Sequence, residues 1–366
     1  MRAGILTYHF ANNYGAVLQT YSLQAVLEKL NVDVEVIDFQ SEHQSDNQAL
    51  MSGTLSLKSI IKNMARLPHY FARKRCIQKF ESFRDKYLIL SRCSFSDPEE
   101  AKQFIEHRYD VVIVGSDQVW NPSVDDFDDI YFTVSGIQIP VYAYAVSLGK
   151  AKQDSLMKFR KNILQFSEIS VREAASVDFL HRIDSEIVPQ KVLDPTLLQT
   201  SDFFEKISVN PGVERKEYMV CYYVGRRGAV SFRRATEKLA RKFACPVYFI
   251  HIGSGLASYG AGVINDCGPE EFLGYLKNAK LVCTNSFHAV ALSLQLGVPF
   301  FSFETGGYED KRKSDLIQKL KLTDRMVYDF DISSIKSYEM SKVDLESRLR
   351  DDRKCSVNYL KRVIEI

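Results

Sequence analysis

The segment from Leu281 to Phe300 constrains the fold more than any other stretch of the chain. Leu281–Cys283 is short and apolar and predicts a strand, and the polar residues that follow are types that cap helices. The apolar run after them predicts a buried helix, which Gly297 and Pro299 bring to an end. A strand, a polar turn, a helix and a second strand in succession are typical of a parallel α/β sheet.

His288 falls in the first turn of this predicted helix, just after the carboxyl end of the strand. Ligands bind at that edge of open α/β sheets, and a helix N-terminus offers unpaired N–H groups to an anion. His288 is therefore a candidate catalytic residue, with Asn285 and Ser286 beside it as candidate anion-binding residues. The alternative is a structural histidine whose hydrogen bonds are satisfied in the core.

Strands alternate with helices through both halves of the chain, which predicts two Rossmann-like domains with parallel sheets. The turn-rich, charged run at 210–216 is the predicted hinge. We therefore expect one domain over residues 1–210 and a second over 211–340. Residues 341–366 should form a C-terminal amphipathic helix that packs back on the first domain. The polar segment 41–53 predicts a loose loop.

The turn after the first predicted strand is polar and holds a glycine, but it lacks the G-x-G-x-x-G fingerprint of dinucleotide-binding folds. Asn12, Asn13 and the backbone at Gly15 can form a polar pocket over the N-terminus of the next helix. A tight turn with asparagines in unusual backbone conformations explains the same residues.

A second polar turn follows the buried strand predicted at 110–114. Four side chains there can form hydrogen bonds, and the only tryptophan of the chain, Trp120, lies among them. The four are Ser116, Asp117, Gln118 and Asn121. A glycine-led polar loop with one large aromatic residue suits a sugar ligand. The alternative is a capping turn in which Trp120 plugs the core.

The composition excludes several classes of protein. A net charge of +2 gives no bulk attraction for nucleic acid. The seven cysteines are odd in number and form no C-x-x-C pair, which favours buried thiols in a reducing compartment over disulfides or a metal site. The chain begins directly with a predicted strand, and no apolar run reaches the roughly 18 residues of a membrane span. We therefore expect a cytoplasmic protein.

Basic and apolar residues interleave over 66–84, as in an amphipathic basic helix. This pattern fits a solvated helix face. It also fits a peripheral contact with the inner face of the membrane, or with an anionic acceptor.

Three segments together resemble the polysaccharide pyruvyl transferase family, and the resemblance spans about residues 1–310. They are Asn13–Gln19, Gly115–Asn121 and Thr284–His288, and Gly115–Asn121 is the most specific of them. Ser170–Glu173 and Leu193–Thr196 also fit the family's pattern.

The resemblance implies a fold similar to the two-domain (GT-B-like) glycosyltransferases, with the active site between the domains. It also implies an activity: transfer of a pyruvyl group from phosphoenolpyruvate to two sugar hydroxyls as a ketal, with release of phosphate. Such ketals decorate cell-surface glycans such as exopolysaccharides and capsules. The acceptor would be a sugar or a lipid-linked oligosaccharide, with no metal and no cofactor besides the co-substrate phosphoenolpyruvate.

The family pattern often has arginine two residues before the histidine, where this chain has Ser286. Arg226 and Arg227 follow the first predicted strand of the second half and are candidates to supply the missing donor-binding charge.

The resemblance gives His288 the role of general acid or phosphate stabiliser, and it makes Asp117 the candidate base. The donor would lie on the second domain and the acceptor on the first. The expected acceptor-binding residues are Asn13, Tyr14, Gly15, Ser116, Gln118, Trp120 and Asn121. A sugar-nucleotide-dependent glycosyltransferase and a non-catalytic sugar-binding relative remain as alternatives.

Overall fold

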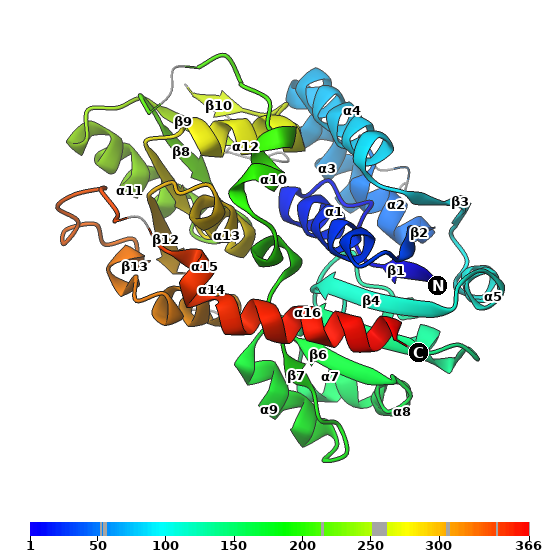
Figure 1. Cartoon of the computed structure of the whole chain (residues 1–366). Helices are drawn as coiled ribbons and strands as arrows, with labels where there is room; N and C mark the ends of the chain where they lie inside the picture. The colour runs from blue at the N-terminus through cyan, green and yellow to red at the C-terminus, as the bar shows by residue number, and fades with distance from the viewer. Residues whose placement is uncertain are drawn as a thin grey trace.

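The computed structural model describes residues 1–51, 53, 57–213, 216–250, 262–304, 308–341 and 343–365. The described strands form two sheets, one in each half of the chain, and every pair of neighbouring strands is parallel (Figure 1). The prediction of two parallel-sheet α/β domains is therefore confirmed.

The first sheet has the order β3-β2-β1-β4-β5-β6-β7. Its strands are β1 (Arg2–Leu6), β2 (Asp33–Phe39), β3 (Leu90–Phe95), β4 (Val111–Asp117), β5 (Val141–Val146), β6 (Glu168–Val171) and β7 (Gln190–Lys191). The direction of winding reverses between β1 and β4, and a crevice for ligands opens at such a switch point in doubly wound folds.

The second sheet repeats this topology with the order β10-β9-β8-β11-β12-β13. Its strands are β8 (Met219–Tyr222), β9 (Val247–Ile250), β10 (Val263–Ile264), β11 (Leu281–Thr284), β12 (Phe300–Glu304) and β13 (Met326–Tyr328). The corresponding switch point lies between β8 and β11, so each domain has one such switch point.

Helices cover both sheets (Figure 1). Those that precede β8 are α1 (Tyr14–Lys29), α2 (Glu42–Gln48), α3 (Leu57–Arg66), α4 (Tyr70–Tyr87), α5 (Pro98–Arg108), α6 (Ile130–Thr133), α7 (Gln153–Met157), α8 (Arg160–Ile163), α9 (Ala174–Ile183) and α10 (Ser201–Ile207). Those that follow it are α11 (Ala229–Lys242), α12 (Pro269–Asn278), α13 (Phe287–Gln295), α14 (Tyr308–Lys319), α15 (Leu345–Arg348) and α16 (Arg350–Ile364).

The prediction of a loop over residues 41–53 is wrong for Glu42–Gln48, which form the helix α2. The side chain of Gln44 accepts a hydrogen bond from the backbone N–H of Ser41 and donates one to the carbonyl oxygen of Asp126. The first bond caps the helix and the second anchors it, so polar residues form a short helix without a large apolar face.

One hydrophobic core runs through both domains on the side of α1, α4, α12 and α13. The ring of Tyr14 lies 4.1 Å from that of Phe272 at an interplanar angle of 3°. The Tyr14 hydroxyl also donates a hydrogen bond to the carbonyl oxygen of Cys267. Stacked aromatic rings bury a large apolar area, so this contact binds the two domains together.

The chain returns to the first domain at its C-terminus, where α16 lies across the first sheet (Figure 1). Tyr359 donates a hydrogen bond from its hydroxyl to the carbonyl oxygen of Ala143, and Ser356 accepts one from the backbone of Leu193. The end of the chain therefore braces strands of the first sheet.

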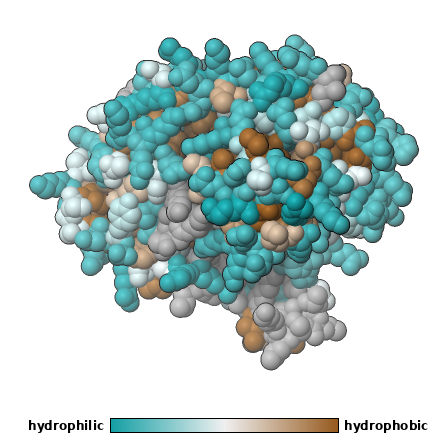
Figure 2. Space-filling model, turned by 90° about the horizontal axis from the view of Figure 1, so that it is seen from below, coloured by the Kyte–Doolittle hydropathy of each residue, from teal (hydrophilic) through white to brown (hydrophobic). Residues whose placement is uncertain are grey.

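The surface in Figure 2 is mostly hydrophilic, with hydrophobic residues in small groups. No helix in the described part of the chain has the length and apolar content needed to cross a membrane. The cysteines are free thiols, and Cys76, Cys221, Cys267 and Cys283 are buried.

Candidate functional site

The two switch points lie close to each other, because the N-termini of α1 and α13 meet between the domains. His288, in the first turn of α13, contacts the backbone of Gly15, in the first turn of α1. Asn13 and Ser286 cap these two helices through their side-chain oxygens. The chain thus brings two of the segments that resemble the family into direct contact.

The His288 side chain is only 10% exposed, and charged groups of the first domain hold its ring. Its Nε2 lies 3.4 Å from Oδ2 of Asp194 and 3.5 Å from Nη1 of Arg172. The carboxylate can accept a hydrogen bond from a protonated Nε2, and the guanidinium can donate a hydrogen bond to an unprotonated Nε2, so this nitrogen has a partner in either protonation state. The Nδ1 side of the ring faces Gly15.

Arg172 follows β6 directly and is the centre of the charged cluster. Its Nη1 lies 2.5 Å from Oδ2 of Asp194, and its Nη2 lies 3.0 Å from Oδ1 of Asp117. Its guanidinium also lies 5.3 Å from the ring centre of Phe287, within reach of a cation–π interaction. One buried cation therefore connects the ends of β4 and β6, the segment after β7 and the start of α13.

Asp194 is fully buried, and its charge is stabilised in place. Burial raises the pKa of its carboxyl, but the charge and hydrogen bond of His288, the Arg172 guanidinium and the Thr196 hydroxyl outweigh that effect. The pKa of Asp194 therefore lies well below its ordinary value. Burial lowers the pKa of Arg172, but the negative charges of Asp194, Asp117 and Glu173 raise it by more, so the net shift is upward. Both partners therefore remain ionised.

Asp117, the candidate base, ends β4 with a φ of 76°. Left-handed backbone is costly for a residue with a side chain, and such conformations cluster at functional sites. The turn directs the carboxylate toward Arg172, and the side chain is 14% exposed. Asp117 is thus held by the same cation that holds Asp194.

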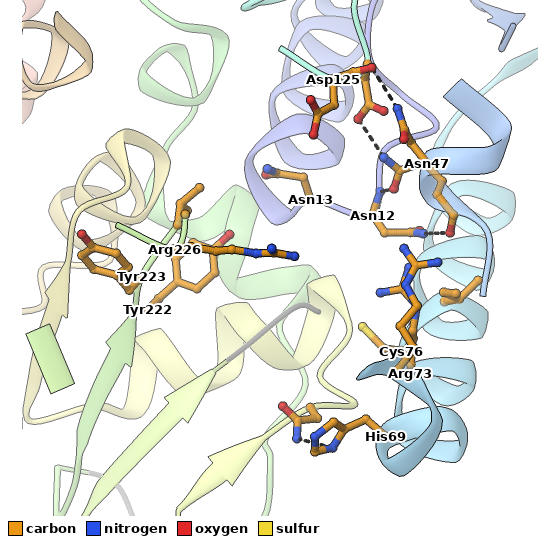
Figure 3. Close-up of a pocket in the computed structure, with 17 residues that line it drawn as sticks. Asn12, Asn13, Asn47, His69, Arg73, Cys76, Asp125, Tyr222, Tyr223 and Arg226 are labelled. Carbon is orange, nitrogen blue, oxygen red and sulfur yellow. Dashed lines mark hydrogen bonds between the residues drawn. The ribbon is translucent and has the colours of Figure 1, made fainter. Parts of the chain in front are cut away.

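A cavity of about 390 Å³ lies between the domains, and its lining does not include His288, Asp117, Arg172 or Asp194 (Figure 3). It is lined from the first domain by Asn12, Asn13, Asn47, Gln48, Arg66, His69, Arg73, Cys76, Ile77, Asp125 and Asp126, and from the second by Tyr222, Tyr223, Val224, Gly225, Arg226 and Asn265. The side chain of Arg226 extends across it from the second domain toward the side of Asn13 and Arg73 (Figure 3). This volume suits a ligand of the size of a substituted monosaccharide.

Asn285 holds the loop that carries Arg226. Its side-chain oxygen accepts a hydrogen bond from the backbone N–H of Val224 at 2.7 Å, and its side-chain nitrogen donates to the Val224 carbonyl at 2.8 Å. Arg226 lines the cavity, whereas the exposed Arg227 is not among its lining residues. The geometry therefore supports an anion contact for Arg226 and gives none to Arg227.

The prediction that Trp120 offers its face to a sugar ring is wrong. The side chain is 0% exposed, stacks on Phe132 with ring centres 5.0 Å apart, and donates its Nε1–H to the Tyr131 carbonyl. The alternative interpretation, in which Trp120 fills the core beneath a capping turn, agrees with this packing.

Three further acceptor-binding predictions are also corrected. Tyr14 is buried against Phe272 in the shared core, and the buried Ser116 donates its hydroxyl proton to the side chain of Gln19. Asn121 is 1% exposed and donates its amide N–H to the side-chain oxygen of Gln118. These residues shape the turn and the core, so they are not available to a sugar.

The basic segment 66–84 faces the rest of the protein at several positions. Arg75 and Lys79 pair with Asp266 and Glu271 of the second domain at 2.9 and 2.7 Å. Arg84 donates a hydrogen bond to the carbonyl oxygen of Phe10 at 3.1 Å. Arg75 and Lys79 thus connect the domains, whereas Arg84 binds within the first domain, so these three cations do not form an open basic face.

The sequence alone assigned no role to Arg172 or Asp194, and it placed Arg66 and Arg73 only in a basic segment that could contact a membrane or an anionic acceptor, not in a cavity. Arg172 and Asp194 belong to Ser170–Glu173 and Leu193–Thr196, the two further segments that resemble the family. Each closely follows a strand, and this position was the sequence signal that could have identified them as site residues. The two arginines belong to the amphipathic segment, where the sequence does not reveal which side chains face inward.

These features define the class: a two-domain protein with doubly wound sheets and a polar, charged cluster where their carboxyl edges meet. A model of the polysaccharide pyruvyl transferase family matches residues 13–307. The chain belongs to the polysaccharide pyruvyl transferase family. No curated protein matches the chain in sequence.

Solved structures of other proteins share the fold. The UDP-N-acetylglucosamine 2-epimerase of Rickettsia bellii matches with a TM-score of 0.57 at 9% identity, covering 99% of this chain and 95% of its own. The UDP-GlcNAc 2-epimerase of Neisseria meningitidis, bound to UDP-GlcNAc, matches with a TM-score of 0.50 at 12% identity, covering 99% and 100%. At these identities the likeness concerns the fold alone.

Proposed function

We propose that the chain transfers the pyruvyl group of phosphoenolpyruvate to two hydroxyls of a sugar in a polysaccharide or its precursor. The observation that carries this proposal is the position of His288. The second domain supplies the imidazole, and Arg172 and Asp194 of the first domain hold it where the two switch points meet. A proton-transfer group at that junction would act between a donor on one domain and an acceptor on the other.

The reaction needs one proton delivered and two removed. The methylene carbon of phosphoenolpyruvate takes up a proton and becomes a methyl group, and a sugar oxygen bonds to the neighbouring carbon and loses its own proton. The bond from that carbon to the phosphate oxygen breaks, and a second sugar oxygen bonds there with loss of its proton. One of the two hydroxyl protons balances the new methyl group, and the other leaves with the phosphate.

His288 is the proposed general acid, since imidazole is the side chain best suited to proton transfer at neutral pH. Asp117 is the proposed base for the sugar hydroxyl. Arg172 is a positioning residue, because it forms ion pairs with Asp117 and Asp194 and a cation–π contact with the ring of Phe287.

The donor is proposed to lie against the second domain. Arg226 would pair with its phosphate or carboxylate, and the first backbone N–H groups of α13 would stabilise the anion. Asn285 would act through the Arg226 loop, which it binds. Ser286 caps α13 at the position where relatives often have arginine, so the charge would come from the neighbouring loop.

The experiment is to measure phosphate release from phosphoenolpyruvate by the full chain with a panel of glycan acceptors, and to confirm ketal formation by mass spectrometry. We expect acceptor-dependent release, and we expect His288→Ala to lower turnover about 10²–10⁴-fold. Arg227→Ala is the matched control on the second domain and should keep full activity.

Other outcomes would replace the proposal. Transfer from UDP-sugars, with phosphoenolpyruvate inert, would make the chain a sugar-nucleotide-dependent glycosyltransferase. Sugar binding without turnover of either donor would make it a non-catalytic relative.

A further inference from the structure

Two arginines of the cavity wall come from one helical region and share one acceptor. Arg66 ends α3, Arg73 lies in the first turn of α4, and both donate to the carbonyl oxygen of Ala49, at 3.2 and 3.1 Å. Arg66 is 6% exposed. The fold therefore brings two guanidinium groups together at the edge of an empty volume.

Neither charge is directly paired with a carboxylate in the described part of the chain, and Asp46 is the acidic residue whose charge acts on Arg66. Among the described residues, Nε of Arg73 is buried without a hydrogen-bond partner. Burial lowers the pKa of Arg73 to about 10, and the charge of Arg66 is the next cause. Burial also lowers the pKa of Arg66, and the charge of Asp46 opposes that shift without cancelling it. Both groups remain charged at neutral pH, so an anion between them would relieve their repulsion.

The rest of the lining suits a sugar. The side-chain amides of Asn12, Asn13, Asn47 and Gln48 line the same cavity. Asp125 and Asp126 lie on its wall as hydrogen-bond acceptors, and Asp126 is bonded to the Gln48 amide at 2.7 Å. Amides and carboxylates bind hydroxyl groups, whereas the arginine pair needs a planar or tetrahedral anion. The cavity therefore combines a polyol surface with an anion subsite.

We propose that Arg66 and Arg73 bind a phosphate group carried by the acceptor sugar. The acceptor would then be a sugar phosphate or a diphosphate-linked sugar, and not a finished neutral glycan. Calling this ligand the acceptor rests on the proposed function, but the anion subsite itself does not. Arg226 extends toward this pair from the second domain, so donor and acceptor anions would occupy opposite walls of one cavity (Figure 3).

The first test is calorimetric binding to the full chain without phosphoenolpyruvate. The probes are inorganic pyrophosphate and glucose 1-phosphate, with glucose as the uncharged comparison. We expect both anions to bind, and we expect Arg73→Gln to weaken binding by about tenfold or more. Lys74→Gln removes one charge from an exposed neighbour on the same helix and should leave the affinity unchanged. Equal affinities in wild type and Arg73→Gln would overturn the subsite.

A stability measurement guards against a folding defect. Removing one of two repelling, largely desolvated charges should leave the melting temperature of Arg73→Gln at or above that of the wild type. If Arg73→Gln does not fold, Arg73→Lys takes its place: it keeps the charge but loses the guanidinium fork, and should bind pyrophosphate more weakly than the wild type. Wild-type affinity in a folded Arg73→Lys would then count against the subsite.

The second test separates acceptor from donor. When the phosphoenolpyruvate concentration is varied, Arg226→Gln should raise the donor KM and Arg73→Gln should not. When the concentration of a phosphorylated acceptor is varied, Arg73→Gln should raise the acceptor KM and Arg226→Gln should not. A raised phosphoenolpyruvate KM in Arg73→Gln alone would assign the subsite to the donor and overturn the proposal. Because binding of pyrophosphate needs no turnover, an inactive enzyme that still binds it would refute only the proposed function.

A final comparison identifies the source of the phosphate. UDP-glucose represents soluble nucleotide sugars, and a polyprenyl-diphosphate glucose in detergent represents lipid-linked ones. Arg73-dependent binding of either supports the subsite, and the tighter of the two identifies the source. Binding of neither, with pyrophosphate also unbound, would refute it.

Discussion

The imidazole of His288 fills the space that a side chain on Gly15 would need. A Cβ at Gly15 would lie 2.2 Å from Nδ1 and 2.6 Å from Cγ of the ring. Real atoms do not approach so closely, so any larger residue would displace the histidine. The glycine of the first polar turn therefore helps to position a residue of the second domain.

Replacement of Gly15 with alanine should consequently impair the site more than the fold. We expect the Gly15→Ala variant to lose about tenfold or more in kcat for pyruvyl transfer, since small misplacements of reacting groups are costly. Gly136→Ala is the control, because its nearest neighbour would be 3.9 Å away. Wild-type turnover in Gly15→Ala would show that the ring position does not matter to the reaction.

The charge of Asp194 gives stability a defined pH dependence. The folded-state pKa of this carboxyl lies below its unfolded value. The interactions of the carboxylate therefore stabilise the fold fully above about pH 4, and this stabilisation decreases as the pH falls below that value. Asp194→Asn should therefore lower the free energy of unfolding by about 3–5 kcal/mol at neutral pH, since it leaves Arg172 buried with one partner fewer.

That penalty should shrink as the pH falls below about 4, because Asp194 then takes up a proton in the unfolded wild-type chain, and it should vanish only when the pH reaches the much lower folded-state pKa. Urea unfolding at several pH values measures the difference. Asp85→Asn, an exposed carboxylate on α4, serves as the reference. A gap between Asp194→Asn and wild type that stays constant down to strongly acidic pH would contradict this assignment of charge.

The two hydrogen bonds from Asn285 to Val224 should matter to donor binding. Asn285→Ala removes both bonds and frees the loop of Arg226, and each bond is worth about 1 kcal/mol. We expect the phosphoenolpyruvate KM to rise by about fivefold to thirtyfold, with a smaller change in kcat. An unaltered KM, together with a raised one in Arg226→Ala, would mean that other contacts hold the loop.

Trp120 should report on unfolding and not on ligands. It is the only tryptophan and is fully buried. We expect blue-shifted emission that does not change when pyrophosphate or a glycan acceptor binds, and that shifts to the red when the chain unfolds. Trp120→Phe should lower stability, because a large core side chain is truncated, while acceptor KM stays the same. A shift of the emission on ligand binding would contradict this prediction and indicate that Trp120 lies at the ligand-binding site.

The fold was predictable because its signals are local. The consecutive β-branched residues of β4 and the caps and stops around α13 appear in the sequence at the spacing that parallel α/β units require. The sequence could not show that Trp120 points inward, since a buried and an exposed indole look the same in a polar turn.

The least predictable part of the site comes from tertiary contacts. α2 has no apolar periodicity, and its anchor is the Asp126 carbonyl far along the chain. Arg66 and Arg73 lie in a helical segment whose inner face depends on how α3 and α4 dock. Arg172 gains its position from Asp117 and Asp194, which are brought beside it by different strands.

The stacked rings of Tyr14 and Phe272 bear on how the protein moves. Two-domain α/β enzymes often close around substrate by a hinge rotation. Here such a rotation would pull apart a packed aromatic pair and the core around it, and would break the hydrogen bond from Tyr14 to Cys267. We therefore expect this packed contact to oppose a hinge rotation that would separate the two halves on that side.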